Sequence, residues 1–420
     1  MKKSIGLFIL FLLVMGLIGT GVIDAETTEL KMTIYGSKND IAIYEERIVL
    51  AEEMYPDIDV ELIYIPGEYA QKVKTMIAGG QAPDIIMLGE DVHAYSSKGQ
   101  IIRLDEYIKE YNVDLQERFA DSVVAQYSYR GGLYAMPDRS GAMIVYYNKD
   151  MFDKAGVDYP DKDWTWDDLV EAGQKLTIRE GDEVVQWGFA AGDWWPWWLS
   201  FIYQNGGEIL NENDQPVVNT PEVIEALQFY NDLVYKYRIA PSLEDFANIG
   251  DPGPDPLFAQ GKVAFQITGF WNVGSLKNVP ELNWDIAPLW GNKKNATVSF
   301  GSGLGITKDS KNQEAAFRIL EFLTSFEGQL PIVENRQDVP ANLELQASDE
   351  FVNADWAAGR DINMDVFKES ADIILTPPLH PQWNEIMKIF GDNLSEVFMN
   401  KRSVEDAVKE IQSRLEFTLF

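Results

Sequence analysis

Residues 30–89 alternate between strand and helix patterns. The segments 30–35, 58–64 and 83–89 predict β-strands, and the segments 40–54 and 69–78 between them predict helices. The third strand is an apolar run, as is typical of a parallel strand that is buried on both faces of its sheet. This order of strands and helices predicts a doubly wound α/β sheet.

The rest of the chain continues as a mixture of helices and strands, without an internal repeat. Thr165 and Ser403 are expected N-caps, because a hydroxyl oxygen accepts a hydrogen bond from the free N–H groups of a first helical turn. We expect the α/β class throughout, with helices at 164–176, 220–237, 313–325, 381–399 and 404–416, and strands at 262–267 and 297–306.

Composition excludes several classes of protein. The 420 residues include 35 basic and 67 acidic side chains, which gives a net charge of −32. Such acidity disfavours nucleic acid and anionic membranes as partners. The absence of cysteine excludes disulfides, Cys-ligated metals and a Cys nucleophile. With only His93 and His380, and with residues 211–214 lacking the other ligands of a calcium loop, we expect no metal and no cofactor.

The N-terminus has the pattern of a secretory signal. Lys2 and Lys3 precede an uncharged apolar run at 5–23, and the small residue Ala25 follows. We expect cleavage after Ala25; the alternative is an uncleaved membrane anchor, because the run is nearly long enough to span a bilayer. No Cys is present to carry a lipid, so we expect a free, monomeric protein in the periplasm.

Several motifs in one order resemble a known family. They are AGGQAPDI at 78–85, GLYAMP at 132–137 with VYYNKD at 145–150, and FAQGKVA at 258–264 with GFW at 269–271. Together, behind a signal segment, they resemble the extracellular solute-binding proteins of sugar ABC importers, the group that contains maltose-binding protein. The resemblance covers roughly residues 30–420, and one departure is the missing lipid-attachment Cys.

The resemblance implies a type II-like fold of two α/β lobes, with a ligand in the cleft between them. Such lobes close on the ligand by hinge motion, and the closed protein delivers it to the membrane permease. The implied chain crossings fall near 136–143, 300–305 and 338–342. The implied lobes are 26–138 plus 306–338, and 139–305 plus 339–420.

Aromatic residues are the strongest candidates for a ligand site. Trp194, Trp195, Trp197 and Trp198 lie within five residues around Pro196, and Asp193 is the expected N-cap of their helix. A flat indole packs against the apolar face of a sugar ring, but core packing is the alternative for each Trp. The resemblance adds Trp271 and Trp383 as stacking platforms.

Polar candidates follow the predicted strands and occupy the crossings. Tyr35 and Ser37 follow the first strand, and Glu90 and Asp91 follow the third, where open α/β sheets bind ligands. Ser37 and Asp91 have helix capping as their alternative. The crossing and second-lobe candidates are Asp138, Arg139, Asn272, Gly301 and Ser302, whereas Asp338 and Asn342 are expected to form turns.

The expected function is capture of a carbohydrate, a di- or oligosaccharide, for an ABC permease. The alternatives are a secreted enzyme acting on glycosides and a lectin-like sensory module. The acidic pairs at 90–91 and 167–168 are adjacent in sequence, so their side chains diverge and neither pair is a ready acid–base couple. We therefore expect no enzyme activity and no catalytic residue.

Overall fold

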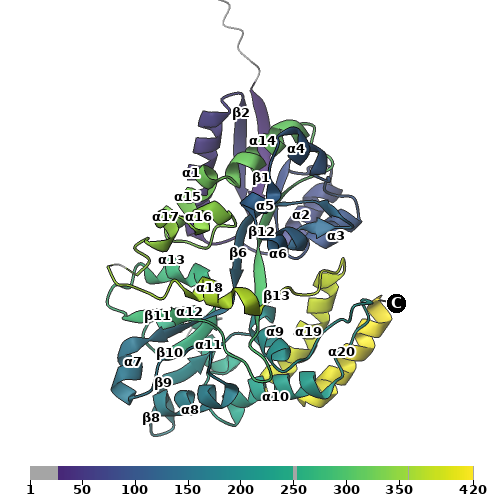
Figure 1. The fold of residues 1–420 in the computed structure, drawn as a ribbon. Coiled ribbons are helices and arrows are strands. Elements are labelled where there is room, and N and C mark those ends of the chain that lie inside the picture. Colours follow the sequence, from purple (N-terminus) through teal and green to yellow (C-terminus); the bar gives the residue numbers. More distant parts are fainter. Residues whose placement is uncertain (1–26, 249–252, 358, 420) are drawn as a thin grey trace, which may run out of the picture.

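A computed structural model of the chain describes residues 27–248, 253–357 and 359–419. It contains two lobes, one above the other in Figure 1, joined at the centre by two long strands. Each lobe is a sheet with helices packed around it, so the predicted α/β class is confirmed. The expected signal at 1–25 lies outside the described residues. Within the described part, no helix has both the length and the apolar character needed to cross a bilayer.

The first lobe is built on the predicted parallel strands. Its sheet runs β13-β12-β3-β1-β2, in which β1 (Thr28–Ile34) pairs in parallel with both β2 (Ile58–Tyr64) and β3 (Ile85–Leu88). A small ribbon of β4 (Ser128–Tyr129) and β5 (Gly132–Leu133) lies beside it. The helices of this lobe are α1 (Lys38–Met54), α2 (Tyr69–Ala78), α3 (Val92–Ser97), α4 (Asp105–Glu110), α5 (Leu115–Arg118), α6 (Asp121–Gln126), α14 (Gln313–Leu323) and α15 (Phe326–Glu334).

The second lobe has a five-stranded sheet in the order β11-β7-β10-β9-β8. Its strands are β7 (Ile144–Asn148), β8 (Ile178–Glu180), β9 (Glu183–Ala190), β10 (Val263–Thr268) and β11 (Trp284–Ala287). Thr165 caps α8 as predicted, and its hydroxyl pairs reciprocally with Asp168. The helices are α7 (Lys149–Ala155), α8 (Trp166–Leu176), α9 (Trp195–Gln204), α10 (Pro221–Tyr235), α11 (Leu243–Asn248), α12 (Pro254–Ala259), α13 (Val273–Leu276), α18 (Val366–Ser370), α19 (Trp383–Phe398) and α20 (Val404–Leu419), with short 3₁₀ turns η1 (Phe270–Asn272) and η2 (Ala371–Ile373).

Two antiparallel strands connect the lobes. They are β6 (Met136–Ala142) and β12 (Thr297–Ile306), and they pair along the boundary between the two sheets (Figure 1). β12 pairs with β3 at one end and with β13 (Ile374–Leu375) at the other. At Gly301 a side chain would not fit, since a Cβ there would lie 2.3 Å from the carbonyl oxygen of Arg139.

The segment after the expected third crossing near 338–342 contacts both lobes. The short helices α16 (Leu343–Gln346) and α17 (Asp349–Val352) pack against α15, and α16 also packs against α5. Leu345 and Phe351 of these helices are buried in one apolar cluster with residues of β7 and β11 in the second lobe. The expected lobe bounds stay a prediction.

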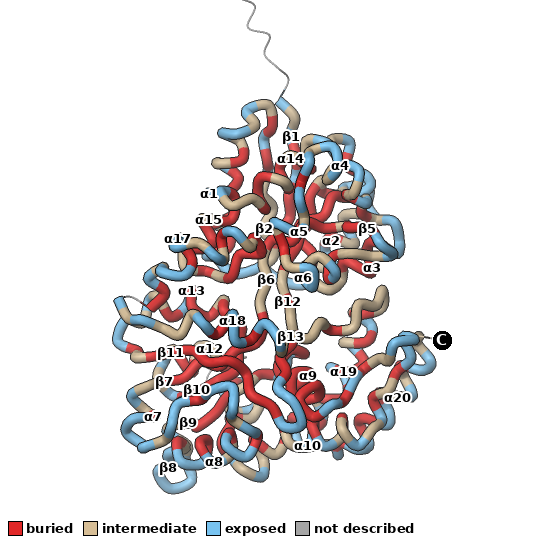
Figure 2. The backbone as a smooth tube through the Cα atoms, viewed as in Figure 1, coloured by how far each residue is buried: buried red, intermediate tan, exposed pale blue. Residues whose placement is uncertain are grey.

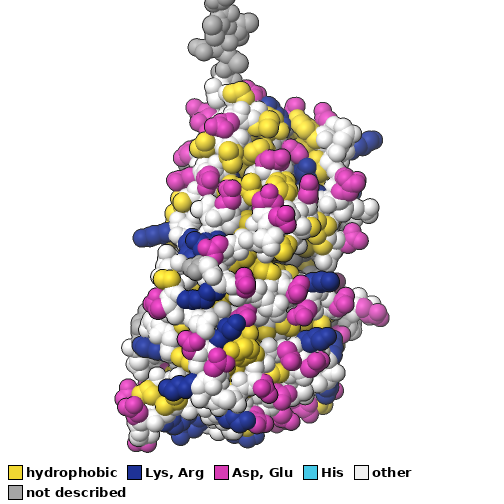
Figure 3. Space-filling model, turned by 60° about the vertical axis from the view of Figure 1, so that its left-hand side comes forward, with side chains coloured by type: hydrophobic (Ala, Val, Ile, Leu, Met, Phe, Trp, Pro, Cys, Tyr) yellow, Lys and Arg dark blue, Asp and Glu magenta, His cyan; other side chains and the backbone are white. Residues whose placement is uncertain are grey.

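Each lobe has its own core. Figure 2 shows buried backbone through the middle of both lobes and exposed backbone around their outer helices. Separate apolar clusters fill the first lobe and the second lobe, and a third joins β7 and β11 of the second lobe to the segment that follows α15. On the face drawn in Figure 3, acidic side chains are spread over both lobes with basic ones scattered among them, as the net charge requires.

Candidate functional site

The carboxyl ends of β1 and β3 bring Tyr35, Glu90 and Asp91 together at the edge of the first lobe. All three residues are partly exposed. Burial, followed by the charges of Glu90 and Asp91, raises the pKa of Tyr35 well above its usual value. A Cβ on Gly89 would lie 3.6 Å from the Tyr35 hydroxyl and 3.8 Å from the carbonyl oxygen of Gly301. These three predicted residues therefore adjoin the crossing strand β12.

The two carboxyl groups have unusual electrostatics. Burial raises the pKa of Glu90 to about 7; its own backbone N–H opposes this shift and Asp91 adds to it. Burial also raises the pKa of Asp91, against the opposing effects of the Gly89 N–H and Lys74. Asp91 Oδ1 accepts a hydrogen bond from Gly89 N at 3.1 Å, and no side-chain bond caps α3. Both carboxyls thus keep acceptor capacity for a partner.

Ser37 caps a helix, which was the alternative to ligand binding that the sequence left open. Its hydroxyl donates to Asp40 Oδ2 at 2.7 Å and accepts from Asp40 N, which completes a capping box at the start of α1. The hydroxyl is therefore occupied by helix capping, although the residue is exposed.

The second lobe contributes an aromatic platform, which we define as Trp194, Trp271 and Phe300. Trp194 is 42% exposed, and its ring centre lies 5.9 Å from that of Trp271 and 6.1 Å from that of Phe300. Trp271 and Phe300 are 5.1 Å apart. The indole N–H of Trp271 donates to Asp255 Oδ2 at 3.1 Å, which fixes the ring. Phe300 gave no signal in the sequence, because its role depends on which side of β12 faces the Trp pair.

Three of the predicted Trp residues are core residues instead. Trp195, Trp197 and Trp383 are buried, and Trp195 meets Trp383 edge to face at 5.3 Å. Trp197 donates its indole N–H to the carbonyl of Ile267. Core packing, the alternative that the sequence left open, thus holds for the Trp residues of α9, all of which are buried, whereas Trp194 before the helix is exposed.

Asp193 is not the N-cap of that helix. The helix begins at Trp195 with Trp194 as its N-cap, and no side chain caps it. Pro196 is at the start, where its missing N–H costs no hydrogen bond. Asp193 is exposed next to Trp194, so its carboxylate stays free to serve as a rim residue.

Asn272 is a buried side chain with unmet hydrogen-bonding capacity. It is fully buried beside Trp271, and neither its Oδ1 nor its Nδ2 has a partner among the described residues. Ser302, also predicted, is buried on β12, and its Oγ is unpaired within the same part of the chain. Buried polar groups nearly always have partners, so such groups point to a bound molecule or ordered water.

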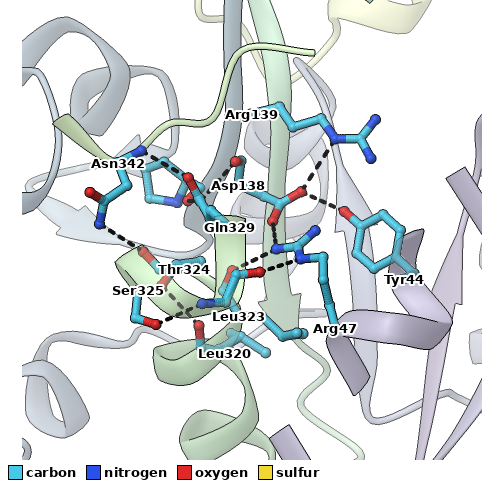
Figure 4. Close-up of polar contacts among 12 residues, drawn as sticks. Tyr44, Arg47, Asp138, Arg139, Leu320, Leu323, Thr324, Ser325, Gln329 and Asn342 are labelled. Carbon is cyan, nitrogen blue, oxygen red and sulfur yellow. Dashed lines mark hydrogen bonds and ion pairs between the residues drawn. The ribbon is translucent and has the colours of Figure 1, made fainter. Parts of the chain in front are cut away.

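The two charged residues of the first crossing are already paired. Asp138 is fully buried, and its carboxylate accepts hydrogen bonds from Tyr44 and from Arg47 Nη2, the latter at 2.5 Å (Figure 4). It is therefore not exposed to a ligand, contrary to the prediction. Arg139 Nη1 donates to Asp40 Oδ1 at 2.6 Å, but its buried Nε and Nη2 have no hydrogen-bond partner among the described residues.

Asp338 was expected only to form a turn, but it is an electrostatic neighbour of Arg139. Burial raises the pKa of Asp338 to about 7, against the lowering effect of Arg139. Its position after α15 gives no local sequence signal for this contact, because the two residues meet only through the tertiary fold.

The parts converge on β12. The backbone of Gly89, the residue before Glu90, lies close to Gly301, and the aromatic platform includes Phe300, the residue before Gly301. An open hollow of about 650 Å³ lies elsewhere, on the outer edge of the second lobe, and contains none of these residues. We take the convergence as the candidate site because it joins flat apolar rings to carboxylate acceptors, the combination that suits a hydroxylated ring.

Comparisons with known proteins concern the fold and the family of the chain. An arabinooligosaccharide-binding protein of Halalkalibacterium halodurans is 25% identical over 94% of this chain and 90% of its own length. An ABC substrate-binding protein from Listeria monocytogenes, solved in complex with cycloalternan, is 29% identical, with a TM-score of 0.86 over 94% of this chain and 99% of its own. Maltose-bound MalE3 of T. maritima is 25% identical, with a TM-score of 0.80 over 93% and 100% of the two chains.

These likenesses confirm the predicted two-lobed fold. The sequence pattern described as bacterial extracellular solute-binding protein matches residues 35–330, which is more than half of the chain. The chain therefore belongs to the family of bacterial extracellular solute-binding proteins.

Proposed function

We propose that this protein captures a di- or oligosaccharide between its lobes for an ABC importer. The observation that carries the proposal is the exposed indole of Trp194, which contacts Trp271 and Phe300. The acidic residues Glu90 and Asp91 follow β3, which pairs with β12, the strand that carries Phe300. The aromatic rings supply apolar contact to the C–H faces of a sugar, and the carboxyl oxygens accept its hydroxyl hydrogens.

The size of the platform favours more than one sugar ring. Trp194 is exposed and Trp271 is partly exposed, and their ring centres lie 5.9 Å apart, so two indoles are available for contact with sugar rings. The ligands named for the similar proteins, arabinooligosaccharide, cycloalternan and maltose, are of this class.

The charges at the site favour an uncharged sugar. Glu90, Asp91 and Asp193 face the candidate site without a basic partner within 4 Å in the described residues. The cations nearest the crossing, Arg47 and Arg139, are ion-paired with Asp138 and Asp40. A phosphate or uronate would therefore meet carboxylates rather than a free guanidinium.

The remaining parts of the proposal concern transport. We expect residues 1–25 to be a cleaved export signal, the mature protein to be a free monomer in the periplasm, and its lobes to close by rotation at the crossings. The closed form then docks on the permease subunits and releases the sugar.

A ligand screen tests the function. Residues 26–420 are mixed with maltotriose, arabinotriose, cellobiose, digalacturonate, a tripeptide and glycerol, and thermal unfolding and calorimetric affinity are measured. A ligand at 100 times its Kd that binds only the folded state adds about 2.7 kcal/mol, which raises Tm by several degrees. We expect saturable binding of a neutral oligosaccharide and no release of monosaccharide over time. Binding of the tripeptide or glycerol alone, or hydrolysis of the sugar, would contradict the proposal.

A further inference from the structure

Asp138 occupies an irregular position in the strand pair that joins the lobes. In the ladder Ser302 faces Arg139 and Gly303 faces Pro137, so the pairing skips Asp138. Asp138 is thus the extra residue of a β-bulge on β6. A bulge bends its strand and redirects the side chain, and such bulges are structural features rather than defects.

The carboxylate of Asp138 is held by helix α1. Tyr44 and Arg47 both donate to it, and Arg47 lies with no exposed surface. Arg47 also donates through Nε to Gly328 O at 2.6 Å and through Nη2 to Leu323 O at 2.5 Å. One guanidinium therefore connects the bulge to α1, to the end of α14 and to α15.

The backbone carbonyl of Asp138 is held by two more contacts. Gln329 Nε2 donates to it at 2.8 Å, and Ala341 N donates at 3.1 Å. The side-chain amide of Gln329 also accepts a hydrogen bond, because Asn342 N donates to its Oε1 at 2.9 Å. Figure 4 shows Gln329 and Asn342 on one side of Asp138 and the Tyr44–Arg47 pair on the other.

All these partners belong to the first lobe or to the segment packed against it. The next residues along β6, from Arg139 to Gly141, are partly exposed and lie where the strand passes toward the second lobe. β6 is therefore held to the first lobe at Asp138 and at Arg139, which pairs with Asp40 of α1, and rotation of the second lobe has to be taken up beyond this point.

Stability alone does not account for this arrangement. Apolar side chains of similar volume usually stabilise a core as well as a buried ion pair does, because the charges must be desolvated. Unlike apolar contacts, charges and directed hydrogen bonds restrict the interacting groups to a single geometry. Here that geometry sets the position and direction of the strand at the boundary between the lobes.

We propose that Asp138 is a positioning residue of the hinge: its bulge and its contacts with α1, Gln329 and Ala341 fix the point on β6 at which the second lobe begins to rotate. This inference rests on the proposed function in one respect, namely that ligand capture uses closure of the lobes. Asp138 acts on the ligand only through the positions of the lobes, since its carboxylate is enclosed.

The distance between the lobes reports on this role directly. The chain has no Cys, so Lys98→Cys in the first lobe and Glu385→Cys in the second, both exposed, give a single pair of spin-label sites. The distance distribution between the two labels is measured without ligand in the parent and in two hinge variants, Tyr44→Phe and Gln329→Leu. Tyr44→Phe removes one hydrogen bond around Asp138 and Gln329→Leu removes three, and neither leaves an unpaired charge. Arg318→Met is the control, because it breaks the bidentate pair with Asp57 in the first lobe, away from the crossings.

We expect both hinge variants to fold and to show a broader ligand-free distribution than the parent, while Arg318→Met lowers Tm and leaves the distribution unchanged. If the population able to close falls about tenfold, the Kd of a sugar that binds the parent rises by the same factor. Asp138→Asn combined with Arg47→Met removes the charges together and gives the same broadening. Hinge variants that lower Tm but keep the parent distance distribution would overturn the inference, because Asp138 would then only stabilise the fold.

The outcome is separable from the proposed function. If maltotriose, arabinotriose and cellobiose all fail to bind the parent, the proposed function fails. The ligand-free distributions then still decide whether Asp138 positions the hinge, because no sugar enters that measurement.

Discussion

Replacing Trp194 by Ala should weaken sugar binding with little effect on folding. Trp194 is 42% exposed. For a Trp of roughly 200 Å², that leaves about 85 Å² of surface for a ligand to cover. At about 25 cal/mol per Å², covering this area contributes about 2 kcal/mol. The Kd of the bound oligosaccharide should therefore rise about 30-fold.

Trp383→Ala is the matched variant for this test. Trp383 is buried against Trp195, so its loss should reduce the free energy of unfolding by about 3–5 kcal/mol while leaving the affinity of the folded protein nearly unchanged. Affinity is measured by calorimetry and stability by urea unfolding, on both variants. The reasoning is refuted if Trp194→Ala binds within twofold of the parent, or if Trp383→Ala loses affinity without losing stability.

Three further predictions follow from the charges. Burial raises the pKa of Glu90 and of Asp338 to about 7. Between the usual carboxyl pKa and pH 7, these two groups are therefore protonated in the folded protein but ionised in the unfolded chain. The free energy of unfolding should consequently fall as pH rises toward 7. Urea unfolding across that range should show a shallower fall in Glu90→Gln, and an identical slope would count against the buried carboxyl. Asp138→Asn alone leaves Arg47 buried without its countercharge and should cost about 3–5 kcal/mol in urea unfolding, whereas a loss below 1 kcal/mol speaks against the pair. Digalacturonate should bind more weakly than a neutral disaccharide and gain affinity in Glu90→Gln, and tighter binding to the parent would contradict an acidic site.

Much of the fold follows from local patterns. The bounds of β2, α2 and β12 coincide with the predicted segments, because strand and helix periodicity and the flanking Gly and Pro residues are local signals. The packing of α16 and α17 between α15 and the second lobe had no local signal, because it joins distant segments.

The site was predictable only in part, for the same reason. The placement of Tyr35, Glu90 and Asp91 follows from strand order, and Trp271 from family resemblance. No local pattern distinguishes the buried Trp195 from the exposed Trp194, because the two residues are of the same type and adjacent in the sequence. The bulge that encloses Asp138 is likewise invisible in a sequence, because it is a property of the pairing with β12.

The place of β12 in the sheet of the first lobe has a consequence for synthesis of the chain. The first lobe contains β1, β2 and β3 from the start of the chain, but the edge next to β3 is closed by residues 303–306. A growing or partly exported chain that ends before Thr297 lacks that strand, so the first lobe cannot complete its sheet until most of the polypeptide has emerged. Joining such distant segments is slow. The sheet of the first lobe is therefore completed late, after residues 303–306 become available to pair with β3.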